Sequence, residues 1–219
     1  MASSTEENYL KSLYNLANAE GEVNLSELAA SLQVSMPTAN SMVKSLQKSG
    51  WVMYEKYKPL TLTKEGKKIA ALIIRKHRLT EMFLVKVMNF GWEEVHEVAE
   101  QIEHIHAPKF FERMDQMLGF PTVDPHGSPI PDPQGKITPL SYTPLSHAKP
   151  GQNVQLAALT NSSTEFLEFL NSRNLSLGTQ LTILSKESYD QTMVVSYAHH
   201  PSETLSEKVF ERLLVRVLE

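Results

Sequence analysis

Apolar residues recur at helical spacing through the first 120 residues of the chain. The pattern predicts four helices, over residues 5–19, 24–32, 35–49 and 63–88. Gly21 and Gly50 interrupt the pattern, and Asn24 and Ser35 are residue types that cap helix N-termini. A turn of three residues joins the second and third helices, which is the layout of a helix-turn-helix.

Two short strands are predicted after Gly50, over residues 51–55 and 59–63, on either side of a basic loop. A helix-turn-helix followed by such a hairpin is typical of a winged helix, so we expect a winged DNA-binding domain over residues 1–63. The residues expected to face DNA lie at the start of the third helix and in the basic loop: Ser35, Pro37, Thr38, Asn40, Ser41, Lys44, Lys56, Tyr57 and Lys58.

The chain beyond residue 63 carries more apolar helical surface than a small DNA-binding domain can bury. The long helix and an amphipathic run near residues 110–118 therefore predict a helical dimerisation domain over residues 64–140. A dimer is expected because a two-fold symmetric operator requires a two-fold symmetric reader.

The composition changes after Gly119. Eight of the twelve prolines lie in residues 121–150, which predicts an irregular segment leading out of the helical domain. Beyond it the pattern predicts one helix over residues 165–171 and four strands, over residues 154–159, 179–184, 192–196 and 214–218. The expected fold class is mainly α with a small β part, ending in a barrel-like domain over residues 150–219.

The net charge of -4 conceals an uneven distribution of charge along the chain. Residues 36–86 hold eleven Lys and Arg against three acids, a segment charge of +8 that suits a phosphate-binding face. The chain has no cysteine, so it forms no disulfide and offers no thiolate ligand. Neither a signal peptide nor a membrane span is predicted, and we expect a cytoplasmic protein without a membrane partner.

Histidines and glutamates recur on one predicted helical face. His96, Glu100, Glu103 and His104 fall at i, i+4, i+7 and i+8 of a predicted uninterrupted helix over residues 92–106. His77 and Glu81 are one turn apart at the end of the long helix. Such side chains from two packed helices form a plausible cage for a first-row divalent metal. An ordinary solvated face opposite an apolar stripe fits the same spacing.

Several short motifs resemble the diphtheria-toxin-repressor family of metal-dependent bacterial transcription regulators, in particular its manganese-sensing members with a third domain. They are the segments at residues 5–10, 75–81, 95–104, 118–121, 125–127 and 130–131. The C-terminal part is similar to the SH3-like domain of small ferrous-transport accessory proteins.

The resemblance implies two metal sites per subunit. An ancillary site would use His77, Glu81 and His96, completed by Glu165 from the third domain, and Asp124 and His126 would join the site that holds Glu81. The primary sensing site would use Asn8, Glu100, Glu103 and His104.

Two departures from the family pattern count against a two-metal primary cluster. Position 8 is Asn, where the manganese branch has Asp and the iron branch has Met, and position 11 is Lys, where the binuclear manganese sensors have Glu. The implied ligands are mainly oxygen donors and include no thiolate. Such a ligand set favours Mn²⁺, with Fe²⁺ as the alternative.

The expected function is that of a homodimeric, metal-activated repressor that binds palindromic double-stranded operator DNA and controls metal-uptake genes, with no small-molecule substrate. An enzyme is not expected, because the sequence contains no HExxH, GxSxG or phosphate-binding glycine loop. A winged-helix regulator that responds to a non-metal ligand or partner through its C-terminal domain is the alternative, and titration of metal against operator binding distinguishes the two.

Overall fold

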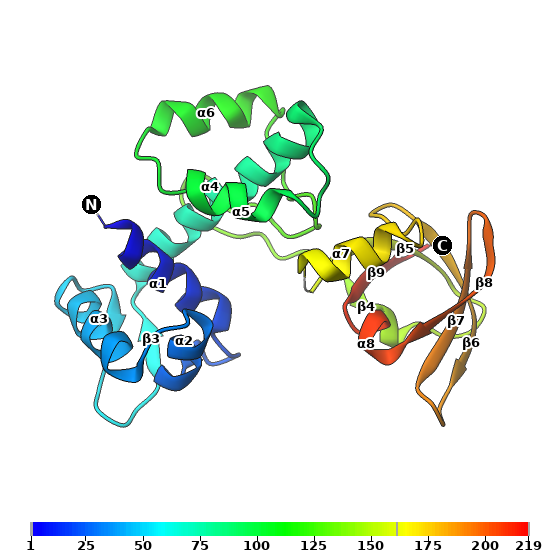
Figure 1. Ribbon diagram of the computed structural model, residues 1–219, viewed down its shortest axis with the longest axis horizontal. Helices are drawn as coiled ribbons and strands as arrows, with labels where there is room; N and C mark the ends of the chain where they lie inside the picture. Colours follow the sequence, from blue (N-terminus) through cyan, green and yellow to red (C-terminus); the bar gives the residue numbers. More distant parts are fainter. Residues whose placement is uncertain (1, 161, 219) are drawn as a thin grey trace. The chain divides into compact units, whose positions relative to one another are not determined.

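The computed structural model describes residues 2–160 and 162–218 (Figure 1). The chain divides into two compact units, which we describe separately. The first comprises Met1–Thr80, Glu97–Thr122 and Ile130–Thr138, and the second comprises Glu81–His96, Val123–Pro129 and Pro139–Glu219. The long helix α4 (Lys64–Met88) contributes residues to both units.

Three helices form the first part of unit 1: α1 (Ser4–Leu16), α2 (Leu25–Ser31) and α3 (Met36–Lys48). Helix α1 begins with a capping box, in which Ser3 and Glu6 satisfy each other's backbone N–H groups. Helix α3 begins at the predicted cap, because the Ser35 hydroxyl accepts a hydrogen bond from the backbone of Thr38.

The helices pack on a small antiparallel sheet of strands β1 (Glu22–Val23), β2 (Val52–Met53) and β3 (Leu60–Leu62), in the order β1-β3-β2. The β2–β3 hairpin is the predicted wing, with shorter strands than expected, and β1 was not predicted. Leu10, Leu28 and Leu46 are fully buried between these elements. Burial of apolar surface on one face of each helix is the main source of stability for such a domain.

Two further helices follow α4, namely α5 (Val95–Ile102) and α6 (Pro108–Met117). The prediction of an uninterrupted helix over residues 92–106 is wrong, because α5 ends at Ile102 and Glu103 and His104 lie in the turn that follows. The chain tightens there through a bond from the Ile105 N–H to the Ile102 carbonyl, and Pro108 holds the preceding residue in a non-helical conformation.

Unit 2 contains a six-stranded antiparallel sheet in the order β4-β9-β5-β6-β7-β8 (Figure 1). The strands are β4 (Thr143–Pro144), β5 (Asn153–Leu159), β6 (Gln180–Glu187), β7 (Thr192–Tyr197), β8 (His200–Ser206) and β9 (Leu213–Val217). Helix α7 (Thr164–Asn171), the short helix α8 (Glu207–Phe210) and the 3₁₀ turn η1 (Leu145–His147) complete it. Strands β4 and β8 were not predicted.

One apolar core lies under this sheet. It includes Leu156 and Val195 from the strands and Leu167 and Leu170 from α7. The proline-rich segment is mostly irregular, as predicted, apart from β4, η1 and a bridge between Val123 and Pro129. Within the described residues, every helix is too short or too polar to cross a membrane.

Candidate metal centres and DNA-binding face

The face expected to bind DNA is formed by α3 and the wing. Ser35, Pro37, Thr38, Ser41 and Lys44 are exposed on or just before α3, while Ala39, Val43 and Leu46 of the same helix are buried. Helix α3 therefore has one buried face and one exposed face.

The wing loop lies beside the start of α3. A groove of about 620 Å³ is lined by Pro37 and Asn40 from the helix and by Lys56, Tyr57 and Lys58 from the wing. The Tyr54 hydroxyl donates a hydrogen bond of 2.8 Å to the Asn40 side chain, which ties the wing to the helix. Hydrogen bonding to Glu55 raises the pKa of Lys58, so its ammonium stays charged.

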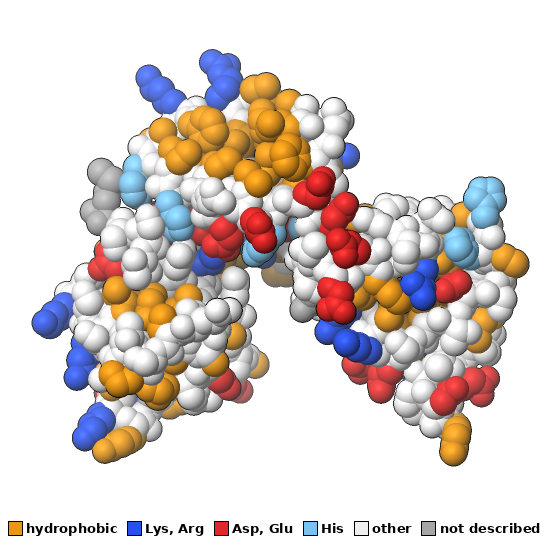
Figure 2. Space-filling view, viewed as in Figure 1, with side chains coloured by type: hydrophobic (Ala, Val, Ile, Leu, Met, Phe, Trp, Pro, Cys, Tyr) orange, Lys and Arg blue, Asp and Glu red, His pale blue; other side chains and the backbone are white. Residues whose placement is uncertain are grey.

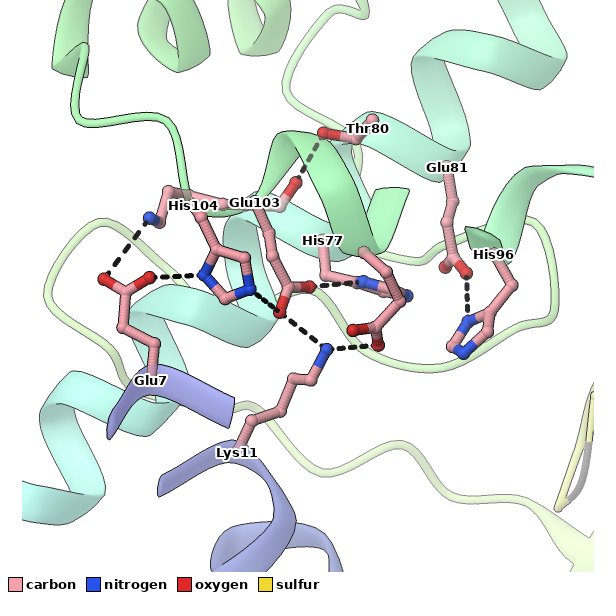
Figure 3. Close-up of polar contacts among 10 residues, drawn as sticks. Glu7, Lys11, His77, Thr80, Glu81, His96, Glu103 and His104 are labelled. Carbon is pink, nitrogen blue, oxygen red and sulfur yellow. Dashed lines mark hydrogen bonds and ion pairs between the residues drawn. The ribbon is translucent and has the colours of Figure 1, made fainter. Parts of the chain in front are cut away.

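A polar cluster in unit 1 links α1 to the end of α5; we call it the lysine cluster, and it comprises Glu7, Lys11, Lys76, His77, Glu100, Glu103 and His104 (Figure 3). The Lys11 ammonium donates to Glu100 Oε1 and, over 2.6 Å, to Glu103 Oε1. His77 Nδ1 donates to Glu103 Oε2 over 2.5 Å. His104 Nδ1 donates to Glu7 Oε2 over 2.6 Å.

Charge and burial shift the pKa of two groups in this cluster, Glu103 and Lys76. Burial raises the pKa of the Glu103 carboxyl, but the hydrogen bond from His77 and the positive charge of Lys11 together outweigh it, so the pKa lies below its ordinary value. Burial lowers the pKa of the Lys76 ammonium, and the nearby Glu7 and Glu103 oppose this effect. Glu103 is thus held as a fully buried, hydrogen-bonded carboxylate.

A second polar cluster lies in unit 2; we call it the aspartate cluster, and its members are Glu81, Asp124 and His126. All three side chains are buried, and each offers one ligand atom within 4.8 Å of the others. His96 adjoins this cluster, with its Nδ1 at 3.4 Å from Glu81 Oε1, and its ring is largely exposed (Figure 3).

The aspartate cluster is held in place by a tight turn. Asp124 Oδ1 accepts hydrogen bonds from the backbone N–H groups of His126 and Ser128, which fixes the carboxylate. Gly127 has φ +87°, and a Cβ on it would lie 2.3 Å from the Ala157 carbonyl oxygen on β5. Only glycine therefore fits at this point of the turn.

The orientation of the His126 ring follows from its other contacts. Its Nε2–H donates to the Trp92 carbonyl over 2.9 Å, and Nδ1 faces Glu81 Oε2 at 3.9 Å. When the ring is neutral, this bond places the lone pair on Nδ1, the nitrogen that would bind a metal. The Trp92 indole stacks on this ring and donates from Nε1 to Asn171 on α7. Two carboxylates and an imidazole oriented in this way are a suitable donor set for a hard divalent cation.

The structure brings Glu81 together with Asp124 and His126, and it places His96 against Glu81, as the resemblance implies. Glu100, Glu103 and His104 also lie together, and His77 bonds Glu103. Glu165 is exposed on α7 and belongs to neither cluster among the described residues.

The buried Oδ1 of Asn8 has no hydrogen-bond partner among the described residues. The sequence did not point to Glu7, Trp92 or Asn171 as residues of these sites. Lys11 stood out in the sequence only as a departure from the family pattern. Its contacts could not be predicted, because its partners Glu100 and Glu103 are 89 and 92 residues away along the chain.

Three family models match successive parts of the chain. The N-terminal DNA-binding domain of iron-dependent repressors matches residues 1–60, their metal-binding and dimerisation domain matches residues 63–132, and the FeoA domain matches residues 143–217. The chain belongs to the iron-dependent repressor family.

Individual relatives of this repressor are named for iron and for manganese. The iron-dependent repressor IdeR of Mycobacterium leprae is 34% identical over 160 residues, 73% of this chain and 67% of the relative. The diphtheria toxin repressor of Corynebacterium efficiens is 28% identical over 195 residues, 84% of each chain. A solved structure of a manganese-dependent transcriptional repressor in complex with manganese is 29% identical, with a TM-score of 0.87 over 97% of this chain and 100% of that chain.

These findings confirm the resemblance, the fold class and the class of function, that of a metal-dependent transcriptional repressor. The matched segments span only about half to two thirds of the length of the mycobacterial relatives. The relatives are named as repressors, and none of the names given above is that of an enzyme. The predicted domain boundaries and metal ligands stay predictions.

Proposed function

We propose that the repressor is a homodimer that binds palindromic operator DNA when Mn²⁺ is bound and thereby controls metal-uptake genes, with Fe²⁺ as the alternative activator. The observation that carries this proposal is the aspartate cluster, three buried ligand-type side chains in a chain of a metal-dependent repressor family. A DNA-binding domain in the same chain provides the output.

Glu81, Asp124 and His126 would hold the metal, with His96 as an additional ligand. This ligand set contains two carboxylates and imidazole nitrogen but no thiolate. Such hard ligands are the kind that Mn²⁺ and Fe²⁺ prefer. When bound, the metal neutralises the two buried carboxylates. The chain's own residues do the orienting: the turn around Asp124 fixes one carboxylate, and the Trp92 carbonyl fixes the His126 tautomer.

Linkage explains how such a site controls DNA binding. The ligands come from α4, from the start of α5 and from the turn at residues 123–129, so the metal favours the conformer in which these three segments converge. A difference of about 3 kcal/mol in metal affinity between two conformers changes their ratio roughly 150-fold.

Exposed apolar side chains support a dimer. Ile105, Phe110, Met117 and Phe120 are 42–66% exposed, and Figure 2 shows hydrophobic side chains gathered over α6. Exposed apolar patches of this kind mark interaction sites, and the region lies within the match to the metal-binding and dimerisation domain.

Different residues of the DNA-binding face would contact different parts of the DNA. Thr38 and Ser41 near the start of α3 would contact base edges, whereas Lys56 and Lys58 in the wing would contact phosphates. We therefore expect Lys58→Ala to weaken binding to all sequences and to reduce the salt slope by about 1.

The test is fluorescence anisotropy with a palindromic duplex, selected by the full chain from a randomised library in the presence of Mn²⁺. We expect Mn²⁺ to strengthen binding at least 10-fold at fixed salt and EDTA to reverse it; anaerobic Fe²⁺ provides the comparison of metals. Equal affinity with and without either metal would overturn the proposal and favour the regulator that responds to a non-metal ligand.

A further inference from the structure

Lys11 occupies a cation position inside the lysine cluster. Its ammonium lies between Glu100 and Glu103, both of which accept its hydrogen bonds (Figure 3). The Lys11 side chain is 13% exposed and that of Glu103 is 0% exposed, so the pair is shielded from solvent. Lys11 comes from α1, whereas its two partners come from the last turn of α5 and the residue after it.

The neighbouring polar groups of the lysine cluster are also engaged. Glu103 Oε2 accepts from His77, Glu7 Oε2 accepts from His104, and the Lys76 ammonium is 3.9 Å from Glu7 Oε1. The carboxylates of Glu7, Glu100 and Glu103 thus contact the ammonium groups of Lys11 and Lys76 and the rings of two histidines. Donors of the chain itself therefore pair with these carboxylates. A buried polar network is stable when its groups are paired in this way.

A divalent metal at Glu100 and Glu103 would compete with this ammonium. One oxygen of each carboxylate, Oε1 of Glu100 and Oε1 of Glu103, already accepts a hydrogen bond from Lys11. The metal would have to displace Lys11 and break a shielded ion pair, or else bind beside a like charge.

We propose that Lys11 is an internal cation that takes the place of a metal ion at Glu100 and Glu103. The lysine cluster then joins α1 of the DNA-binding domain to the end of α5 whether or not metal is present. This inference rests on the proposed function in one respect, that the metal response comes from the aspartate cluster. It gives Lys11 a positioning role and predicts one metal ion per subunit.

The test is Lys11→Met in the full chain, which removes the charge and keeps most of the side-chain volume. In EDTA we expect the thermal midpoint to fall by about 10 °C, because the buried Glu103 carboxylate and the partly exposed Glu100 carboxylate lose their counter-charge. Equilibrium dialysis with Mn²⁺ should give one ion per subunit for the wild type and two for Lys11→Met, and Mn²⁺ should restore the midpoint. Lys11→Arg keeps a cation and should behave as the wild type.

Two results would overturn the inference. One is a wild-type chain that binds two Mn²⁺ ions per subunit and loses one of them in Glu100→Gln. The other is Lys11→Met with unchanged midpoint and unchanged stoichiometry. If Lys11→Met does not fold, the Mn²⁺ stoichiometry of Glu100→Gln decides between the two cases. The inference predicts that this variant still binds one Mn²⁺ ion per subunit. If Glu100 is a metal ligand, the variant should bind one ion fewer than the wild type. Failure of the proposed function would be seen in a different measurement. Operator affinity would then be the same with and without Mn²⁺, while the Mn²⁺ stoichiometries of wild type and variants would still be as predicted.

Discussion

The lysine cluster and the aspartate cluster of the repressor contain similar residue types, but different contacts orient their side chains. In the lysine cluster the Lys11 ammonium lies between Glu100 and Glu103. In the aspartate cluster a tight turn orients Asp124, and a backbone carbonyl sets the tautomer of His126. A set of Glu and His at ligand spacing is therefore insufficient to identify a metal site, because a nearby side-chain cation competes for the same oxygens.

The largest effect is expected from Glu103→Gln, which tests the lysine cluster. The change leaves Lys11 with only Glu100 and should destabilise the metal-free protein by about 3 kcal/mol. The pKa of Glu103 is lowered in the folded chain, so its contribution to stability is complete above its unfolded pKa and is lost as pH falls through the folded value.

The measurement is urea denaturation of wild type and Glu103→Gln at about pH 7 and about pH 4. The difference in the free energy of unfolding should be large at the higher pH and smaller at the lower one. The same difference at both values would show that Glu103 does not act as a charged partner of Lys11.

Asp124→Asn tests the aspartate cluster. The amide keeps the side-chain shape and the oxygen that holds the turn but removes the negative charge. We therefore expect the operator affinity of the variant in Mn²⁺ to fall by about 100-fold or more. In EDTA, wild type and Asp124→Asn should bind the operator with the same affinity. Glu165→Gln on the exposed surface of α7 is the matched control and should retain the wild-type response. A normal metal response in Asp124→Asn would remove this cluster from the mechanism.

Gly127→Ala tests whether the turn positions the ligands. Its Cβ would clash with the Ala157 carbonyl oxygen, so the turn must shift, and we expect Mn²⁺ affinity to fall about 10-fold. Gly178→Ala also has a positive φ but meets no atom within 4 Å, which isolates the backbone strain of about 1 kcal/mol. Isothermal titration calorimetry of both variants gives the comparison, and equal losses would contradict a positioning role for the turn.

The smallest effect is expected from Trp92→Phe. The variant keeps the backbone carbonyl that accepts from His126 but loses the indole N–H bond to Asn171. We expect Mn²⁺ affinity to fall by less than about 10-fold, because only a contact behind the ligand is lost. A loss as large as that of Asp124→Asn, measured by the same titration, would mean that the indole itself orients His126.

The sequence predicted the winged helix well because its signals are local. The Ser35 cap, the left-handed Gly50 and the apolar spacing of α3 all act within one helix. The end of α5 depends on a turn toward Pro108, which helical spacing does not register. Strand β8 escaped prediction because, of its seven residues, only Leu205 is buried and no alternating pattern results.

The residue types of the candidate site and most of its division into two groups were predicted, but the cation that meets one of the groups was not. Helical spacing placed Glu100, Glu103 and His104 together, as the structure does. Which cation meets them is decided by the packing of α1 against the end of α5, and Lys11 is 89 residues from Glu100 along the chain. No pattern along the sequence encodes a contact of that range.

The most direct test is anomalous X-ray diffraction from crystals of the full chain grown with Mn²⁺. We predict one manganese peak per subunit, surrounded by Glu81, Asp124 and His126, with the Lys11 ammonium still bonded to Glu100 and Glu103. A manganese peak between Glu100 and Glu103, with Lys11 displaced, would contradict the account.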